Sequence, residues 1–305
     1  IGAAYLLIDY TCPLLRKKQI LNDINVKIIL MKDASIPAEY NYLNLSDTSI
    51  WSYNKAPIIA TNPDFLCYVV YTSGTTGKPK GIKISHRNLS NYCSSKTGSI
   101  FSKCFSNSIK SIVSVTNYAF DIFITESVFA LLHQIVIYMT SDEEVNNPIA
   151  LSNLVKQYHI ESIQTTPSKM LLYCGNHENL SFLSCFKAII LGGEPFNTSL
   201  LKLIRSHSEA KVFNVYGPAE TTVWVTCKEL SNHEDISKIS IGKPLYGTDI
   251  FIVSPENEIC PFGIPGEICI EGANVGEGYI GTNFDSKSSF EMLSTVPKRT
   301  IYHTG

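Results

Sequence analysis

The chain has 305 residues, of which 44% are hydrophobic and 17% charged, so it carries enough apolar side chains for a core and is not a disordered segment. Its 25 Lys and Arg against 27 Asp and Glu give a formal net charge of −2, which disfavours nucleic-acid binding as its main function. The longest apolar stretch, residues 128–139, is too short to span a bilayer, so we expect a soluble protein that does not associate with a membrane.

The nine cysteines are odd in number, contain no C-x-x-C spacing and lie mostly among apolar neighbours. This usage is typical of buried free thiols and predicts a reducing, cytoplasmic location. The chain begins at Ile1 within an apolar run and stops directly after Tyr302-His-Thr, which indicates a piece of a longer protein.

Between about residues 60 and 225, short β-branched runs alternate with helical patterns, which predicts βα units around largely parallel sheets. Strands are expected at residues 66–71, 111–115, 135–139, 162–165, 187–191 and 212–215. Asn147 as a cap and Pro148 at the first helical position predict a helix with Leu151 and Val155 on its apolar face. After about residue 230, Gly and Pro flank short alternating strands at residues 249–253 and 267–271, which predicts a β-rich portion.

A glycine-rich loop follows the first predicted strand, where residues 71–81 read Tyr-Thr-Ser-Gly-Thr-Thr-Gly-Lys-Pro-Lys-Gly. Glycines let backbone N–H groups approach a phosphate, the hydroxyls donate further hydrogen bonds, and Lys78 or Lys80 supplies positive charge. The spacing excludes a Walker A loop, because only two residues stand between Gly74 and Gly77. On composition alone, a flexible solvent loop is the alternative.

Residues 66–82 closely resemble the phosphate-loop signature of adenylate-forming enzymes, and specifically of the adenylation domains of nonribosomal peptide synthetases. Further segments resemble that family's motifs in the expected order, and the resemblance covers essentially the whole chain: residues 2–9, 120–121, 214–222 (Asn-Val-Tyr-Gly-Pro-Ala-Glu-Thr-Thr), 266–272, 275–279 and 302–305. The resemblance implies a partial adenylation core of the α/β class. We expect α/β subdomains over about residues 1–230, a β-rich, barrel-like portion over about 231–305, and no C-terminal lid.

The resemblance also implies a ligase that condenses an α-amino acid with ATP to an aminoacyl-adenylate and pyrophosphate. Lys80 and Glu220 would be the catalytic residues, and Glu220 would also hold Mg²⁺. A solvated acid beside a turn is the competing interpretation of Glu220, and a plain strand-to-helix turn competes at Gly193 and Glu194. The implied phosphate- and nucleotide-binding residues are Thr72, Ser73, Gly74, Thr75, Thr76, Gly77, Gly193, Glu194, Asn214, Tyr216, Gly217 and Thr221.

By the same resemblance, Asp121 would pair with the α-ammonium group of the substrate, because a buried carboxylate needs a cationic partner. A helix N-cap is the alternative role for Asp121. Bulky residues at three pocket positions should leave little space beyond the substrate Cα, which is similar to glycine-selecting members, although Trp224 could also be a core aromatic. The implied pocket consists of Asp121, Ile122, Thr125, Gln164, Ile190, Gly192, Val215, Val223 and Trp224.

The family passes its aminoacyl group to the phosphopantetheine thiol of a carrier protein, so we expect a peptidyl carrier domain and a condensation domain in the same longer chain. Because closure of the lid completes such sites, we expect this piece alone to bind nucleotide weakly and to turn over slowly. Two alternatives stay open at this point: an acyl- or aryl-coenzyme A ligase of the same superfamily, and a degenerate ATP-binding module without catalysis.

Overall fold

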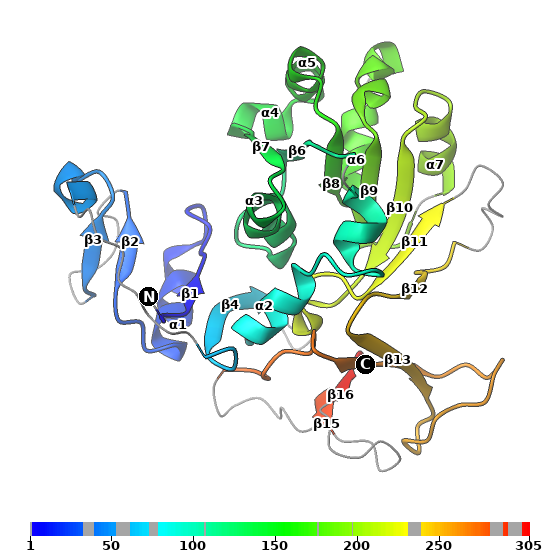
Figure 1. Cartoon of the computed structure of the whole chain (residues 1–305). Helices are drawn as coiled ribbons and strands as arrows, with labels where there is room; N and C mark the ends of the chain where they lie inside the picture. Colours follow the sequence, from blue (N-terminus) through cyan, green and yellow to red (C-terminus); the bar gives the residue numbers. More distant parts are fainter. Residues whose placement is uncertain are drawn as a thin grey trace.

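A computed structural model of the whole chain describes residues 2–32, 40–52, 62–72, 79–106, 108–175, 177–196, 198–230, 239–280, 289–291 and 301–305. These residues form a seven-stranded sheet, a three-stranded sheet, a four-stranded C-terminal sheet and a two-stranded ribbon (Figure 1). No helix in these ranges is long and apolar enough to cross a membrane.

The seven-stranded sheet has the order β12-β11-β10-β9-β8-β6-β7. The strands from β10 to β7 run parallel to one another, whereas β11 and β12 extend the sheet in antiparallel fashion. Five of the six predicted strands lie here, which confirms the expected βα organisation. In chain order the strands are β6 (Ser111–Ser114), β7 (Val136–Met139), β8 (Ser162–Thr165), β9 (Ala188–Gly192), β10 (Lys211–Tyr216), β11 (Thr226–Leu230) and β12 (Lys243–Pro244).

Helices cover one face of this sheet, against which Ile189 and Leu191 pack. The helix predicted from its cap forms here: the Asn147 side chain accepts hydrogen bonds from the backbone N–H groups of Ile149 and Ala150, which satisfies donors that a helix start leaves unpaired. The elements on this side are α4 (Asp142–Asn146), α5 (Pro148–Tyr158), α6 (Pro167–Cys174), the 3-10 helix η5 (His177–Cys185) and α7 (Thr198–Arg205).

The opposite face of the sheet, which carries Ile190, packs against a three-stranded sheet of order β1-β4-β5 and several short helices. The predicted strand at residues 66–71 is β4, and the chain returns from it as the antiparallel strand β5, which the sequence analysis did not include. The elements are β1 (Tyr5–Leu6), β4 (Leu66–Thr72), β5 (Lys80–Ser85), α2 (His86–Tyr92), the π-helix η2 (Phe101–Phe105), the 3-10 helix η3 (Asp121–Ile124), the π-helix η4 (Thr125–Phe129) and α3 (Ala130–Leu132).

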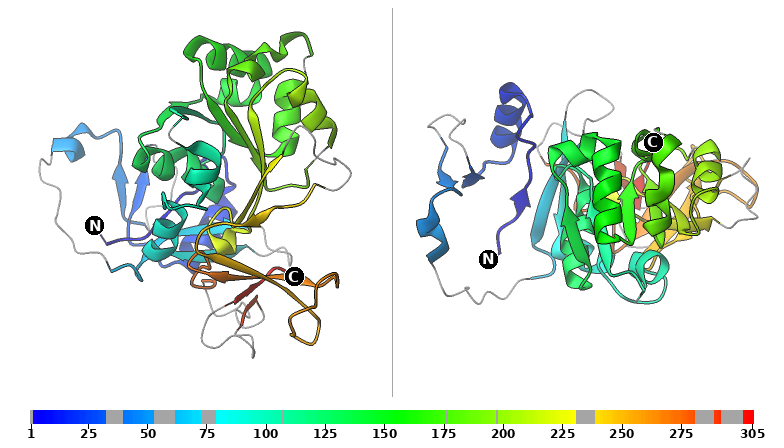
Figure 2. Two further views of the ribbon diagram at one scale, coloured as in Figure 1. Left: turned by 45° about the vertical axis from the view of Figure 1, so that its right-hand side comes forward. Right: turned by 90° about the horizontal axis from the view of Figure 1, so that it is seen from above.

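The described residues 2–32 and 40–52 lie to one side of the seven-stranded sheet, as the view from above shows (Figure 2). Strand β1 joins them to the rest by pairing in parallel with β4, with Tyr5 opposite Tyr68. The remaining elements of this part are α1 (Leu14–Asp23), β2 (Ile29–Met31), β3 (Tyr42–Asn44) and the 3-10 helix η1 (Thr48–Ser52).

The C-terminal portion is β-rich, as the sequence predicts, and its four strands have the antiparallel order β13-β14-β16-β15. The barrel-like closure expected there is wrong for the described residues, because β13 and β15 are the free edges of an open sheet. The division near residue 230 stays a prediction. The strands are β13 (Thr248–Val253), β14 (Glu267–Gly272), β15 (Phe290–Glu291) and β16 (Ile301–His303), and the 3-10 helix η6 (Ala219–Thr221) lies before β11.

All nine cysteines are free thiols, and five of them are buried. Cys104 and Cys227 lie in the main core with their sulfur atoms 3.5 Å apart, a hydrogen-bonding distance, and form no disulfide. The expected pattern of buried free thiols is therefore confirmed for this pair and for Cys67, Cys174 and Cys269.

Candidate active site

The two ends of the predicted phosphate loop are held together by strand pairing. Thr72 at the end of β4 is the cross-strand partner of Lys80 at the start of β5. The Lys80 ammonium group lies 5.0 Å from the centroid of the Tyr279 ring, a distance at which a cation is attracted to the ring face. The predicted loop residues Ser73, Gly74, Thr75, Thr76 and Gly77 lie outside the described residues.

Glu220 is buried on η6, with 8% of its surface exposed, and tyrosines from the C-terminal portion bind its carboxylate. The Tyr279 hydroxyl donates to Glu220 Oε1 over 2.8 Å, and the Tyr302 hydroxyl also hydrogen-bonds to Glu220. Burial and the nearby Glu220 charge raise the pKa of Tyr279, so this tyrosine stays a donor at neutral pH. Lys80, Tyr279 and Glu220 thus form one contiguous group.

Sequence analysis assigned no role to Tyr279, although it ends the motif at residues 275–279. The sequence signal that could have identified Tyr279 is its place in a segment that resembles a family motif. Its partner could not be read from the sequence, because Tyr279 and Glu220 are 59 residues apart. Backbone contacts bring them together: the Gly276 N–H donates to the Glu220 carbonyl, and Tyr279 forms a bridge with Ile82 of β5.

A strained turn follows Glu220. Thr222 and Val223 have φ values of 59° and 68°, a left-handed conformation that is unfavourable for β-branched residues. Gly217 accommodates this turn, because a Cβ added there would lie 2.1 Å from the Val223 carbonyl oxygen. The Thr222 hydroxyl holds the turn from outside by donating to the Asn274 carbonyl over 2.7 Å.

The strained turn brings Asp121 into the same site. Asp121 is the first residue of η3, and Phe120 occupies the N-cap position, so the structure does not give Asp121 the N-cap role. Burial raises the pKa of Asp121 to about 6, the backbone N–H groups of Ile122 and Val223 oppose that rise by binding the carboxylate, and the negative charge of Glu220 adds to it. Asp121 is therefore a desolvated carboxylate beside a second carboxylate.

Three of the predicted pocket residues are joined by hydrogen bonds. Trp224 Nε1 donates to Gln164 Oε1 over 2.8 Å, and Gln164 Nε2 donates to the Ile122 carbonyl over 3.0 Å. Both polar side chains are fully buried, so these bonds satisfy groups that would otherwise be costly. Gly192 allows the arrangement, since a Cβ there would lie 2.8 Å from Trp224 Cη2.

The other predicted pocket residues lie in the same core but differ in what they contact. Ile190, Val215 and Val223 belong to one buried apolar cluster with Trp224. Thr125 is fully buried, and its hydroxyl lies 2.6 Å from the Tyr92 hydroxyl.

The predicted nucleotide-binding residues Gly193 and Glu194 directly follow β9. Gly193 adopts φ +80°, and a Cβ there would lie 3.7 Å from Ile122, which places this turn beside the pocket residues. The Glu194 carboxylate accepts a hydrogen bond of 3.0 Å from the backbone N–H of Ser168 at the start of α6. Its pKa is lowered mainly by a hydrogen bond to the Ser168 side chain, and this backbone bond lowers it further.

Residues around β10 divide into a structural and an accessible group. Asn214 Nδ2 donates to the Ser240 carbonyl and the Thr221 hydroxyl to the Pro218 carbonyl, so both side chains already serve the fold. The Tyr216 side chain is only partly buried, and its hydroxyl hydrogen-bonds to the Thr304 side chain, so ring surface is available to a ligand.

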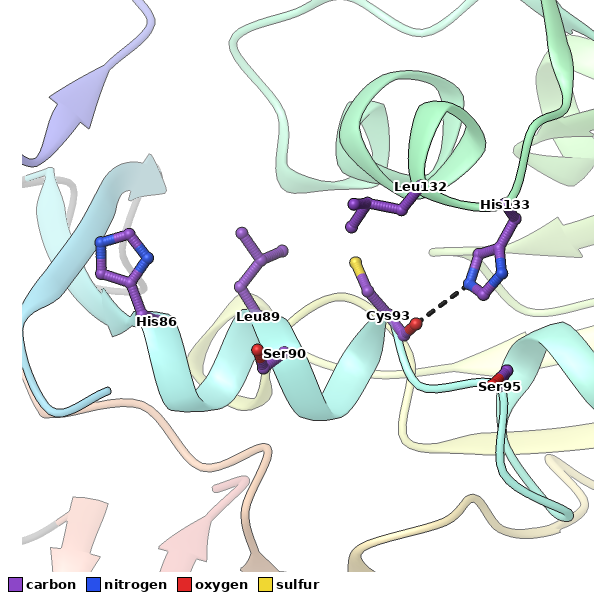
Figure 3. A pocket seen from close by; sticks show the side chains of 7 residues that line it. All are labelled: His86, Leu89, Ser90, Cys93, Ser95, Leu132 and His133. Carbon is purple, nitrogen blue, oxygen red and sulfur yellow. Dashed lines mark hydrogen bonds between the residues drawn. The ribbon is translucent and has the colours of Figure 1, made fainter. Parts of the chain in front are cut away.

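Two cavities lie near these elements. The one that includes Asp121 has a volume of about 20 Å³, space for about one water molecule. The larger one, of about 400 Å³, contains none of the predicted site residues and lies between α2 and the end of α3. Figure 3 shows His86 and Leu89 of α2 on one side of it and His133 on the other, where His133 Nε2 lies 3.0 Å from the Cys93 carbonyl oxygen.

The sequence matches the AMP-binding enzyme family over residues 1–280. The chain belongs to that family. Among curated relatives, gramicidin S synthase 2 of Aneurinibacillus migulanus is 29% identical over 312 residues, and surfactin synthase subunit 3 of Bacillus subtilis strain 168 is 29% identical over 313 residues. Both alignments cover 100% of this chain, but only 7% and 24% of the respective relatives, so the chain spans a quarter or less of these AMP-binding proteins.

Solved structures of AMP-binding proteins share the fold. A four-domain nonribosomal peptide synthetase bound to AMP and glycine superposes with a TM-score of 0.82 at 25% identity and covers 100% of this chain and 22% of that one. The N-terminal subdomain of Klebsiella oxytoca NpsA in complex with 3-hydroxybenzoyl-AMSN gives a TM-score of 0.84 at 18% identity and covers 100% of this chain and 77% of that one. The fold is thus that of the large N-terminal subdomain of adenylation domains, as expected.

Proposed function

We propose that this chain is the core of an adenylation domain that activates an α-amino acid with ATP, forming an aminoacyl-adenylate and pyrophosphate. The observation that supports this most is the turn over residues 220–224. It connects the buried carboxylate Glu220, the backbone N–H that reaches Asp121, and the Trp224 side chain bonded to Gln164. One short segment therefore touches both a carboxylate suited to a metal–phosphate group and one suited to an ammonium group.

The charges on the site fit the two substrates. Two neighbouring carboxylates repel each other, and the α-ammonium group of an amino acid beside Asp121 would relieve that repulsion. On the other side, Lys80 at the start of β5 would offset the negative charge of the ATP phosphates, which an attacking carboxylate must approach.

Mg²⁺ is the metal that this reaction implies, and the donor chemistry of Glu220 fits it. Mg²⁺ is usually bound through one or two protein carboxylates together with substrate phosphates. A carboxylate has about four lone-pair positions, so Glu220 retains acceptor capacity beyond its two tyrosine hydroxyls. When bound there, Mg²⁺ would supply charge neutralisation at the phosphates.

The pocket supports a small amino acid, with glycine as the first candidate. Ile122, Gln164 and Trp224 are tied together by hydrogen bonds, so they form a wall that a larger side chain could not displace one residue at a time. The solved synthetase bound to AMP and glycine adds weak support at 25% identity. Excluding one extra methyl group by crowding is worth about 1–3 kcal/mol, so alanine would be rejected only moderately.

The acceptor of the aminoacyl group would be the phosphopantetheine thiol of a carrier domain. This part of the proposal is supported by the relatives: the chain covers 7% and 24% of two synthases, and one solved neighbour is a four-domain nonribosomal peptide synthetase. A condensation domain in the same natural protein is part of the proposal.

Amino-acid-dependent ATP–pyrophosphate exchange in the full natural protein that contains this chain tests the proposal, with the twenty standard amino acids, salicylate and a fatty acid as substrates. We expect exchange to be greatest with glycine and to fall at least a hundredfold in Glu220→Gln, because the metal-binding carboxylate is lost. Exchange with a larger amino acid would retain the activity and overturn the glycine assignment.

Two other outcomes identify the alternatives. Exchange only with salicylate or the fatty acid would indicate an acyl- or aryl-coenzyme A ligase and overturn the role proposed for Asp121. ATP binding without exchange for any acid, unchanged in Glu220→Gln, would indicate a non-catalytic ATP-binding module.

A further inference from the structure

A second cluster of polar side chains lies in the C-terminal sheet and shares no residue with the site described above, although Tyr302 and Thr304 on either side of His303 contact Glu220 and Tyr216. Cys269 on β14 and His303 on β16 are directly opposed cross-strand partners. Glu267 precedes Cys269 by two residues on β14, so both side chains project from the same face of the strand. Within the described part of the chain, these are the three Cys, His and acidic residues whose side chains could hold a metal ion together.

The three side chains converge on one atom, Nδ1 of His303. Cys269 Sγ lies 3.3 Å and Glu267 Oε2 3.4 Å from this nitrogen, and all three ligand atoms lie within 4.8 Å of one another. His303 Nε2 is buried without a hydrogen-bond partner in the described residues. A nucleophilic Cys-His-Glu relay needs the thiol and the carboxylate on opposite ring nitrogens, so this geometry argues against it.

The two separations that involve His303 agree with tetrahedral coordination instead. With metal bonds of about 2.3 Å to sulfur and about 2.0–2.1 Å to nitrogen and oxygen, ligand atoms around Zn²⁺ are separated by roughly 3.4–3.6 Å. The observed separations of 3.3 and 3.4 Å from His303 Nδ1 match this range closely, and the Cys269 and Glu267 ligand atoms lie within 4.8 Å of each other. The backbone pairing of Cys269 with His303 holds two of the three ligands in place before any metal arrives.

Burial and access also fit a metal site. Cys269 is fully buried, the His303 side chain is 13% exposed, and the Glu267 side chain is 33% exposed. An ion could therefore enter from the side of Glu267 and be shielded from solvent by the sheet. The combination of one thiolate, one imidazole and one carboxylate favours Zn²⁺ over Mg²⁺ or Ca²⁺, which prefer oxygen ligands.

We propose that Glu267, Cys269 and His303 bind one zinc ion, with a water molecule as the fourth ligand, and that the ion joins β14 to β16. Binding would release the thiol proton of Cys269, because the thiolate is the metal ligand. The proposal does not rest on the proposed adenylation activity, and its test does not measure that activity.

Cobalt(II), a spectroscopic substitute for zinc, provides the test on the full natural protein that contains this chain, prepared with chelator. We expect one equivalent of Co²⁺ to produce a thiolate-to-cobalt charge-transfer band, and one equivalent of Zn²⁺ to abolish it. Cys269→Ser should remove the band, and Glu267→Gln and His303→Asn should weaken Co²⁺ binding at least tenfold. Cys260→Ser is the matched control, because Cys260 lies in the same portion of the chain, outside the cluster, and should leave the band unchanged.

The competing results are equally clear. A band that persists in Cys269→Ser, or one that disappears equally in Cys260→Ser, would overturn the assignment by showing that other thiols bind the ion. Glu267→Gln changes a partly exposed side chain to its near-isostere, so it tests the site even where Cys269→Ser fails to fold. Undiminished Co²⁺ affinity in both Glu267→Gln and His303→Asn would also overturn it.

Discussion

At the scale of single residues, Asp121 shows how a binding group can be costly to the free protein. Its pKa in the folded chain is raised to about 6, mainly because the carboxylate is desolvated. An acid with a raised folded-state pKa favours the fold in its protonated form, so the stability it contributes is complete below pH 3.8 and is lost as the pH rises through 6. A difference of about two units between the folded and unfolded pKa of Asp121 corresponds to a free energy of about 3 kcal/mol at most.

We therefore predict that Asp121→Asn stabilises the protein at pH 7 by about 1–3 kcal/mol in urea unfolding, and by much less at pH 4, where Asp121 is protonated. Asp64→Asn serves as a control, because Asp64 is exposed and paired with the exposed Arg87, and it should change stability by less than about 1 kcal/mol. Asp121→Asn less stable than the natural protein at pH 7 would contradict the assigned desolvation.

The same carboxylate predicts a pH dependence of substrate use. If ionised Asp121 binds the α-ammonium group, kcat/KM for the amino acid in pyrophosphate exchange should fall about tenfold per pH unit below pH 6. In Asp121→Asn, kcat/KM should be low at every pH, and this acidic limb should disappear. A limb that survives the substitution would belong to another group.

At the scale of elements, the left-handed turn at Thr222 and Val223 depends on the glycine that precedes it. We predict that Gly217→Ala destabilises the protein by about 2–4 kcal/mol in urea unfolding, because the added Cβ would lie 2.1 Å from the Val223 carbonyl oxygen and 2.8 Å from the Trp224 Cα. Gly175→Ala is the control: that glycine has a right-handed helical conformation, and a Cβ there would lie 3.2 Å from the Leu172 carbonyl oxygen, so alanine should cost less than about 1 kcal/mol. Equal effects of the two substitutions would contradict the steric argument.

The elements also show what the sequence could predict. Runs such as Ser162–Thr165 are short, β-branched and bounded by polar turns, so their local pattern specified a strand without knowledge of the fold. The helix at Pro148–Tyr158 was predictable for a similar reason, since its cap residues are adjacent in sequence.

Features that depend on distant partners were not predictable in this way. The π-helical segments Phe101–Phe105 and Thr125–Phe129 follow from packing in the core, and residue pattern does not distinguish them from α-helix. At the candidate site, motif resemblance suggested Glu220 and Asp121 separately. The Val223 N–H reaches Asp121 only because Thr222 and Val223 adopt a left-handed conformation. No local sequence pattern predicts that conformation for Thr and Val.

At the scale of the whole molecule, Glu220 connects the seven-stranded α/β portion to the C-terminal sheet. Its backbone carbonyl accepts the Gly276 N–H over 2.8 Å, and its carboxylate accepts the Tyr279 and Tyr302 hydroxyls. The proposed metal-binding carboxylate is thus oriented by residues from the other portion of the chain, so a change in their relative position would also move Glu220.

We predict that Tyr279→Phe lowers stability by about 1.5–3 kcal/mol, the usual cost of removing a hydrogen bond to a charged group, and lowers kcat of pyrophosphate exchange about tenfold. Tyr173→Phe is the control, because Tyr173 is buried and donates one hydrogen bond of 3.1 Å to the Val145 carbonyl, away from the site. It should cost about 1 kcal/mol and leave kcat unchanged. An unchanged kcat in Tyr279→Phe would show that Glu220 is oriented without it.

The hydrogen-bonded wall of Trp224, Gln164 and Ile122 constrains how substrate preference can evolve. Replacing Trp224 alone by an aliphatic residue would leave Gln164 Oε1 buried without a donor, and replacing Gln164 alone would strand the indole N–H. Either single substitution therefore lowers the stability of the protein, whereas replacing both residues together leaves no buried polar group unpaired. Lineages that descend from this sequence should therefore change these two positions together, and laboratory libraries that vary one position at a time should miss the accessible specificities.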